Sequence, residues 1–119
     1  VIDVTSYPHI TDLFGAADAL ITDYSSVMFD YSATGRPMIF FVPDMDDYRD
    51  SLRGVYFDLS EVAPGPVLAS QDDVLDAVRR MAGDVAVHQP RYDAWQQRFN
   101  PHDDGRAAKR VLDRLLALG

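Results

Sequence analysis

The chain has 119 residues, no cysteine and a formal net charge of −8, with 47% hydrophobic and 25% charged residues. This composition is typical of one folded domain with a modest core, and it excludes disulfides and thiolate metal sites. The excess of acid argues against non-specific nucleic-acid binding, which depends on lysine and arginine. No apolar run approaches the ~20 residues of a membrane-spanning helix.

The first half of the chain predicts strands alternating with helices. Apolar and β-branched runs predict three strands, over Val1–Val4, Ala19–Thr22 and Met38–Val42. Capping residues and spacing predict two helices between them, over Leu13–Ala17 (capped by Thr11 and Asp12) and Ser25–Ala33.

A turn, Thr34-Gly35-Arg36-Pro37, closes the second of these helices, since glycine suits a C-cap and proline cannot continue a helix. The strand, helix and strand on either side of it form a compact βαβ unit. Such a unit implies parallel strands and a right-handed crossover.

The second half of the chain predicts a helical tail. Pro64-Gly65-Pro66 is interpreted as a turn or linker. Three helices are predicted after it, from Ser70 to about Met81, over Pro90–Phe99, and from about Asp104 to Leu118. The last of them is expected to turn four apolar side chains inward: Val111, Leu112, Leu115 and Leu116.

The stretch Asp23-Tyr24-Ser25-Ser26 places polar side chains where a buried strand hands over to a helix. In an open parallel sheet, ligands bind beyond the carboxyl ends of the strands, where helix N-termini present free N–H groups. The Ser25 and Ser26 hydroxyls add two donors, so an anion such as a phosphate is one interpretation. The other is a plain helix cap made by Asp23 or Ser25.

Asp30 follows Ser26 by four residues and therefore lies on the same helix face. Its carboxylate suits the hydroxyls of a sugar or glycerol attached to a phosphate, with Tyr24 near the mouth of such a site. The alternative is an exposed carboxylate, or one paired with Arg36 or Arg53.

The remaining polar residues give no sign of a metal or polyanion site. None of His9, His88 and His102 has the paired spacing of a metal site, so each is interpreted as a loop or capping residue. The late basic residues alternate with aspartates and are interpreted as a solvated helix face, with an anionic lipid surface as the alternative. They are Arg98, Arg106, Lys109, Arg110 and Arg114.

An ordered set of motifs resembles the CDP-glycerol glycerophosphotransferases, which build teichoic acids and related polymers. Between Ala16 and Pro66 the chain reads D-Y-S-S, F-D-Y, G-R-P, D-x-x-x-Y-R, R-G-x-Y-x-D and P-G-P. The resemblance implies a Rossmann-like α/β fold that forms part of the C-terminal half of a GT-B glycosyltransferase fold. Residues 1–119 would be the C-terminal part of the donor-binding domain, without the acceptor domain.

The resemblance also implies the chemistry. Glycerol phosphate would pass from CDP-glycerol to a lipid-linked polyol-phosphate acceptor, with no cofactor, in the cytoplasm at the inner face of the membrane. Ser25 and Ser26 would contact the donor pyrophosphate and Asp30 the donor. Thr22, Asp23 and Tyr24 are further candidates for substrate binding because they adjoin the serine pair. Arg49 and Arg53 are secondary candidates for phosphate contacts, with salt bridges to Asp44, Asp46 or Asp47 as the alternative.

The family's histidines lie upstream of Val1, a start that itself indicates an excised piece, so this chain alone is expected to be inactive. Two alternatives stay open. One is a GT-B glycosyltransferase or ribitol-phosphate transferase with another nucleotide donor. The other is a non-catalytic α/β interaction module in which Asp23–Ser26 only caps a helix.

Overall fold

A computed structural model describes residues 1–44, 47 and 58–119 of the chain. Three parallel strands form a small sheet in the order β1-β2-β3. β1 (Leu20–Thr22) pairs with β2 (Met38–Phe41), which pairs in turn with β3 (Val67–Leu68). The helix α2 (Val27–Ser32) connects β1 to β2. The predicted α/β class with a parallel sheet is therefore confirmed.

β2 contributes side chains to the core on both faces of the sheet, because successive side chains of a strand point to opposite faces. Met38 and Phe40 are 2% and 0% exposed and belong to the main cluster, which also includes Met28 and Tyr31 of α2. Ile39, 2% exposed, points the other way and packs with Val74 and Ala77. A strand buried on both faces reads as a continuous apolar run, as this one does.

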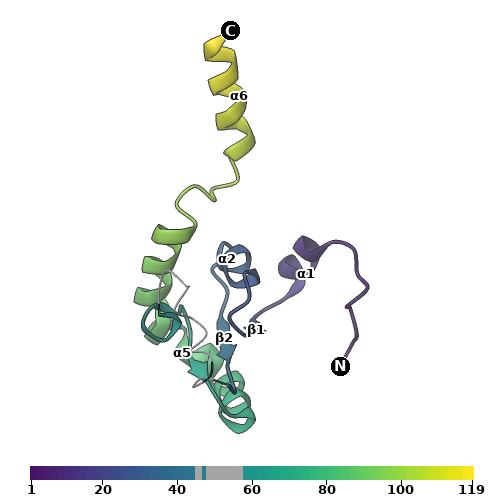
Figure 1. The fold of residues 1–119 in the computed structure, drawn as a ribbon, viewed down its shortest axis with the longest axis vertical. Helices are drawn as coiled ribbons and strands as arrows, with labels where there is room; N and C mark the ends of the chain where they lie inside the picture. The colour runs from purple at the N-terminus through teal and green to yellow at the C-terminus, as the bar shows by residue number, and fades with distance from the viewer. Residues whose placement is uncertain (45–46, 48–57) are drawn as a thin grey trace.

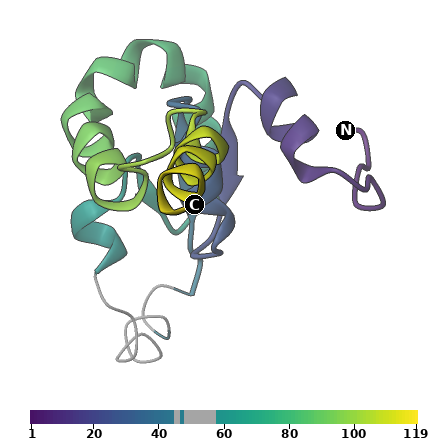
Figure 2. The same cartoon turned by 90° about the horizontal axis from the view of Figure 1, so that it is seen from above.

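α5 (Gln71–Phe99) is a single helix of 29 residues, so the prediction of two helices was wrong. It contributes Val74 near its start to one face of the sheet and Trp95 near its end to the other. Figure 2 shows it as an arch around the sheet. Pro90 lies inside the helix, where proline removes a hydrogen bond and permits bending without ending the helix. Ser70 caps its start, as predicted, by accepting the Asp73 N–H.

β3 was not predicted, since the Pro64–Pro66 turn looked like a linker. The turn is buried instead, and the Phe40 N–H donates to the Pro66 carbonyl oxygen at 2.9 Å. A Cβ atom added to Gly65 would lie 1.8 Å from the Met38 carbonyl oxygen. Only glycine permits this close approach of two backbones, and β3 pairs with β2 because of it.

α1 (Ile10–Ala16) begins at Ile10 after His9, before the predicted cap at Thr11 and Asp12. Its last turn is held by Arg36, whose Nη1 donates to the carbonyl oxygens of Gly15 at 2.8 Å and Ala17 at 2.6 Å. The predicted turn around Gly35 is confirmed, with glycine in the left-handed region at φ 71°.

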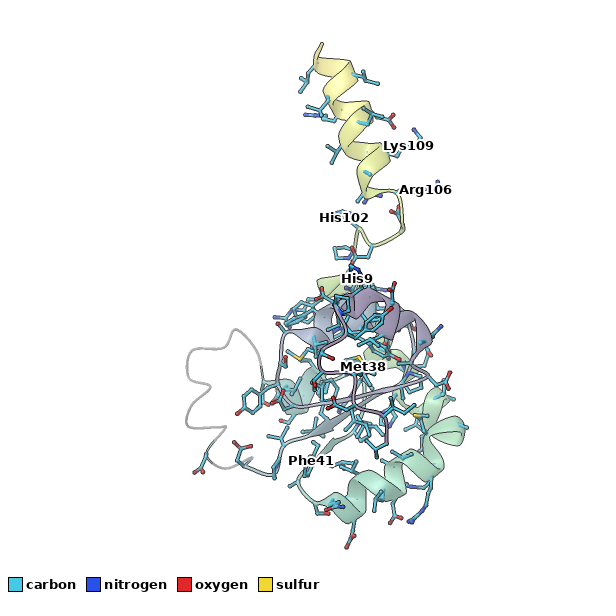
Figure 3. The ribbon with its side chains drawn as sticks, turned by 90° about the vertical axis from the view of Figure 1, so that its right-hand side faces the viewer. His9, Met38, Phe41, His102, Arg106 and Lys109 are labelled. Carbon is cyan, nitrogen blue, oxygen red and sulfur yellow. The ribbon has the colours of Figure 1, made fainter. Side chains whose placement is uncertain are left out.

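The two ends of the chain stand apart from this body (Figure 1). Residues 1–4 adopt no regular structure, so the strand predicted over Val1–Val4 was wrong. α6 (Ala107–Leu118) buries none of its residues, and the inward orientation predicted for its leucines was also wrong: Leu115 is 61% exposed. In Figure 3, His102 and Arg106 lie on the connection that leads to α6 and Lys109 in its first turn, away from the sheet, whereas Met38 lies inside the body. The short helix α4 (Leu59–Val62) completes the fold.

Candidate functional site

The carboxyl ends of β1 and β2 meet at a hollow in the surface, the carboxyl-end hollow. Its described lining consists of Ile21, Thr22, Asp23, Tyr24, Phe41, Pro43 and Asp44. This is the edge at which ligands bind in open parallel sheets, because the strand ends leave space and polar backbone groups there. Three of the predicted site residues, Thr22, Asp23 and Tyr24, line it directly.

The segment Asp23–Ser26, called the serine loop below, continues from this lining into α2. The Asp23 carboxylate accepts the Ser25 N–H at 2.8 Å, a local turn that fixes the start of the loop. Ser26 is the N-cap residue of α2, but its side chain makes no capping hydrogen bond. Within residues 1–44, 47 and 58–119, neither serine hydroxyl has a hydrogen-bond partner, and both side chains are exposed.

α2 is shorter than predicted. It has six residues, beginning at Val27 rather than Ser25. A six-residue helix has a small dipole, so an anion at this loop would depend mainly on hydrogen bonds from hydroxyl and N–H groups. For the plain capping interpretation, Ser26 makes no side-chain capping bond, whereas Asp23 does accept the Ser25 N–H just before the helix.

Asp30 lies in the first turn of α2 and is exposed. The alternative pairing with Arg36 does not occur, since the Arg36 guanidinium faces the end of α1. The carboxylate is four residues from Ser26, on the same side of the short helix. It is therefore accessible to a ligand that also reaches the serine loop.

Negative charge dominates the described part of the carboxyl-end hollow. The charge of Asp44 raises the pKa of the Tyr24 hydroxyl, and desolvation and the Asp23 charge add to the effect. Tyr24 therefore stays protonated at neutral pH. No lysine or arginine is among the described lining residues. Arg49 and Arg53, the predicted cationic contacts, lie outside the described residues.

Sequence reasoning missed Phe41, Pro43 and Asp44 as parts of this site. The signal was available, because they lie at or just beyond the end of a strand parallel to β1, and such ends meet at one edge. Among residues 1–44, 47 and 58–119, no three histidine, aspartate or glutamate side chains gather closely enough to hold a metal ion. No helix in that part of the chain has the length and hydropathy to cross a bilayer.

A second hollow lies at the opposite, amino ends of the strands and is called the amino-end hollow. It has a volume of about 430 Å³ and separates the arch of α5 from β2 and β3. Its lining includes Met38, Ile39, Pro66, Ala77, Met81 and Tyr92. It contains none of the predicted site residues.

The sequence is similar to bacterial enzymes of teichoic acid synthesis. It is 40% identical over 109 residues to a teichoic acid glycerol-phosphate transferase of Staphylococcus aureus, covering 92% of this chain and 28% of that protein. It is 38% identical over 113 residues to a teichoic acid ribitol-phosphate primase of Bacillus spizizenii, covering 95% and 28%.

The structure gives the same result. It matches the wall teichoic acid polymerase TagF with a TM-score of 0.86 and 37% identity, over 98% of this chain and 28% of that one. A variant of that polymerase soaked with CDPG matches with a TM-score of 0.85. The chain thus spans 28–29% of the length of each of these relatives.

Residues 1–117 match the family described as CDP-Glycerol:Poly(glycerophosphate) glycerophosphotransferase. The match includes the serine loop and Asp30, together with both strands that border the carboxyl-end hollow. The chain belongs to this glycerophosphotransferase family.

Proposed function

We propose that this chain is part of the donor-binding domain of an enzyme that transfers glycerol phosphate from CDP-glycerol to a lipid-linked polyol-phosphate acceptor. Residues 1–119 would form the C-terminal part of that domain, within the C-terminal half of a GT-B fold. The acceptor domain and the catalytic base would belong to another part of the polypeptide. A lipid-linked acceptor places the enzyme at the inner face of the membrane.

The position of the serine loop is the observation that carries the proposal. In a member of a CDP-glycerol transferase family, this loop leads from β1 into α2 beside the carboxyl-end hollow. Its two hydroxyls have no partner among the described residues, so they are available to donate to phosphate oxygens. Hydrogen bonds to a charged group contribute roughly 1.5–3 kcal/mol each.

Different residues would bind different parts of the donor. Ser25 and Ser26 would bind the pyrophosphate, and Asp30 would accept hydrogen bonds from the glycerol hydroxyls. Asp23 and Asp44 repel phosphate, so positive charge has to come from elsewhere; Arg49 and Arg53 are the candidates in this sequence. Two serine bonds alone give about 3–6 kcal/mol before the entropic cost of binding is subtracted, so the affinity from these bonds alone would be millimolar at best.

In the reaction, an acceptor hydroxyl attacks the phosphorus that carries glycerol. The new P–O bond forms as the bond to CMP breaks, CMP leaves with the bridging oxygen, and the hydroxyl proton passes to a base outside this chain. Hydroxyl donors that already face the phosphate stabilise the charge that develops on its oxygens.

A second candidate donor is CDP-ribitol. The relative from Bacillus spizizenii is named as a ribitol-phosphate primase, and its identity to this chain is close to that of the glycerol-phosphate transferase. Both donors share the pyrophosphate and differ in the polyol. A choice between them would depend on Asp30 and on groups outside the described residues.

Calorimetric titration of this chain with CDP-glycerol, CDP-ribitol and UDP-glucose tests the proposal. We expect the CDP-polyols to bind with a Kd near 1 mM and UDP-glucose to bind more weakly. The double variant Ser25→Ala/Ser26→Ala should lose at least tenfold in affinity. Ser6→Ala, an exposed serine in the N-terminal segment, is the matched control and should bind as the unmodified chain does. Equal binding by the double variant would contradict the proposal.

A further inference from the structure

The orientation of α2 depends on contacts with other elements. The helix has six residues, and an isolated helix of that length is unstable in water. Its first turn has no side-chain cap, so the orientation of the helix and of the serine loop before it depends on contacts made elsewhere. Met28 and Tyr31 pack in the main cluster, and the hydrogen bonds that side chains of other elements make with α2 are concentrated at its other end, where it meets the last turns of α5.

Ser32, the last residue of α2, is the centre of these contacts. It is a polar side chain with 0% exposure. Its hydroxyl accepts a hydrogen bond from Trp95 Nε1 at 2.9 Å. The hydroxyl oxygen also lies 2.7 Å from two acceptors, the Phe29 carbonyl oxygen and Asn100 Oδ1. The single hydroxyl hydrogen can be donated to only one of these acceptors at a time, and the Phe29 carbonyl oxygen has a second donor in Asn100 Nδ2.

Asn100, the C-cap residue of α5, completes the junction. Its N–H donates to the Gln96 carbonyl oxygen at 2.8 Å, which ends the long helix. Its Nδ2 donates to the Phe29 carbonyl oxygen at 3.0 Å and to Asp103 Oδ2 at 3.0 Å. Gln96 Nε2 in turn donates to the Ser32 carbonyl oxygen at 2.8 Å. Side chains at the end of α5 thereby donate to the Phe29 and Ser32 carbonyl oxygens of α2, the second of which also accepts the Gly35 N–H at 3.2 Å.

Ring packing supports the same junction. The rings of Phe29 and Trp95 are stacked with centroids 5.4 Å apart and an angle of 12° between their planes. Phe99 packs on both, with centroid distances of 4.9 Å to Phe29 and 4.5 Å to Trp95. Because both hydrogen bonds and ring contacts join α2 to the end of α5, a rotation of α2 would break several contacts at once.

We propose that Ser32, Trp95 and Asn100 are positioning residues of the donor site. They fix the last turn of α2 against the end of α5, and through this short helix they set the direction in which the serine loop and Asp30 face the carboxyl-end hollow. None of the three residues lines that hollow. Ser32 is more than 60 positions away in sequence from both Trp95 and Asn100, which it contacts. The inference rests on the proposed function for its ligand.

The test compares Asn100→Ala with Val74→Ala. Asn100→Ala removes the amide at the edge of the junction. Val74 is 8% exposed and packs with Ile39 and Ala77 on the opposite face of the sheet. Val74→Ala therefore lowers stability without touching the junction. Both variants are measured at a temperature at which each remains folded.

The first readout needs no ligand. Backbone amide shifts of Asp23–Ser26 should change in Asn100→Ala and match the unmodified chain in Val74→Ala. The second readout is the Kd for CDP-glycerol, which should rise about tenfold in Asn100→Ala and stay unchanged in Val74→Ala. Ser32→Ala provides a second test at the junction and should give the same pattern.

Unchanged loop amides in Asn100→Ala and Ser32→Ala would overturn the proposal, as would equal weakening of binding in Val74→Ala. Failure of the unmodified chain to bind CDP-glycerol would count against the proposed function alone, because the ligand-free amide shifts would still decide whether the junction positions the loop.

Discussion

Leu59 in α4 and Leu115 in α6 both lie on the apolar side of a helix, yet they are 1% and 61% exposed. Leu59 packs in the main cluster with β2 and the end of α5, whereas α6 buries none of its residues and belongs to neither core cluster of the described residues. The same residue type in the same secondary structure therefore contributes very differently to stability. Helical spacing identifies an apolar face, but a packing partner decides whether that face is buried.

The largest expected effect comes from truncating these two leucines. Leu59→Ala should lower the free energy of unfolding by about 2–5 kcal/mol, because it leaves a cavity in a fully packed cluster. Leu115→Ala should change it by less than about 0.5 kcal/mol, since its side chain is already in solvent. Chemical denaturation of both variants measures the difference. Similar losses would mean that the two regions are packed alike.

Two glycines show the same contrast between a packed and an open position, here for the backbone. Gly65→Ala should destabilise the fold by about 1–3 kcal/mol or more, since its Cβ would overlap the Met38 carbonyl oxygen and push β3 away from β2. Gly83→Ala, in the arch of α5 with nothing within 4 Å of the new Cβ, should stabilise the chain by about 0.5–1 kcal/mol. Thermal unfolding of the pair provides the check. A stable Gly65→Ala variant would show that the turn lies farther from β2.

Arg36→Ala tests how α1 is attached to the centre. Loss of the guanidinium removes the side-chain donor to the Phe14 and Gly15 carbonyl oxygens, whereas the Ala17 oxygen keeps the Tyr31 hydroxyl at 3.0 Å; we expect a cost of about 1 kcal/mol. Amide hydrogen exchange should accelerate over residues 10–17 and remain slow in β2. Faster exchange throughout the sheet would show that Arg36 supports the whole core.

The smallest effect is a pH dependence at Tyr92, whose hydroxyl donates to the Arg36 carbonyl oxygen at 2.7 Å. Burial raises the pKa of Tyr92 above its usual value of 10.0. Its stabilising contribution is therefore complete below pH 10 and is lost as the pH rises toward the folded-state pKa. Tyr92→Phe should cost about 1 kcal/mol at pH 8, and its deficit relative to the unmodified chain should shrink between pH 10 and 11. A constant deficit over this range would contradict the assignment.

The βαβ unit and the serine loop could be predicted because local signals determine them. Two apolar runs, a helical stretch and the Gly35 turn follow one another without competing interpretations. β3 could not be predicted, because its two residues pair only through the approach of Gly65 to Met38, a contact between distant segments. The continuity of α5 through Pro90 was also hidden, since Tyr92 and Trp95 hold the helix to the core beyond the proline.

The candidate site divides in the same way. Thr22–Ser26 and Asp30 follow from their order after one strand, and Asp44 could have been placed beside them from the predicted parallel pairing of β1 with β2. The roles of Ser32 and Asn100 were not visible at all, because their contacts join α2 to a helix end about 70 residues away.

Mapping of amide shifts on titration with CDP-glycerol shows whether the donor binds at the carboxyl ends of the strands. We expect saturable shifts centred on Thr22–Ser26 and Asp30, with Ala77, Met81 and Tyr92 around the amino-end hollow unaffected. Shifts centred on the amino-end hollow, or none in the serine loop at millimolar CDP-glycerol, would contradict the proposed donor site.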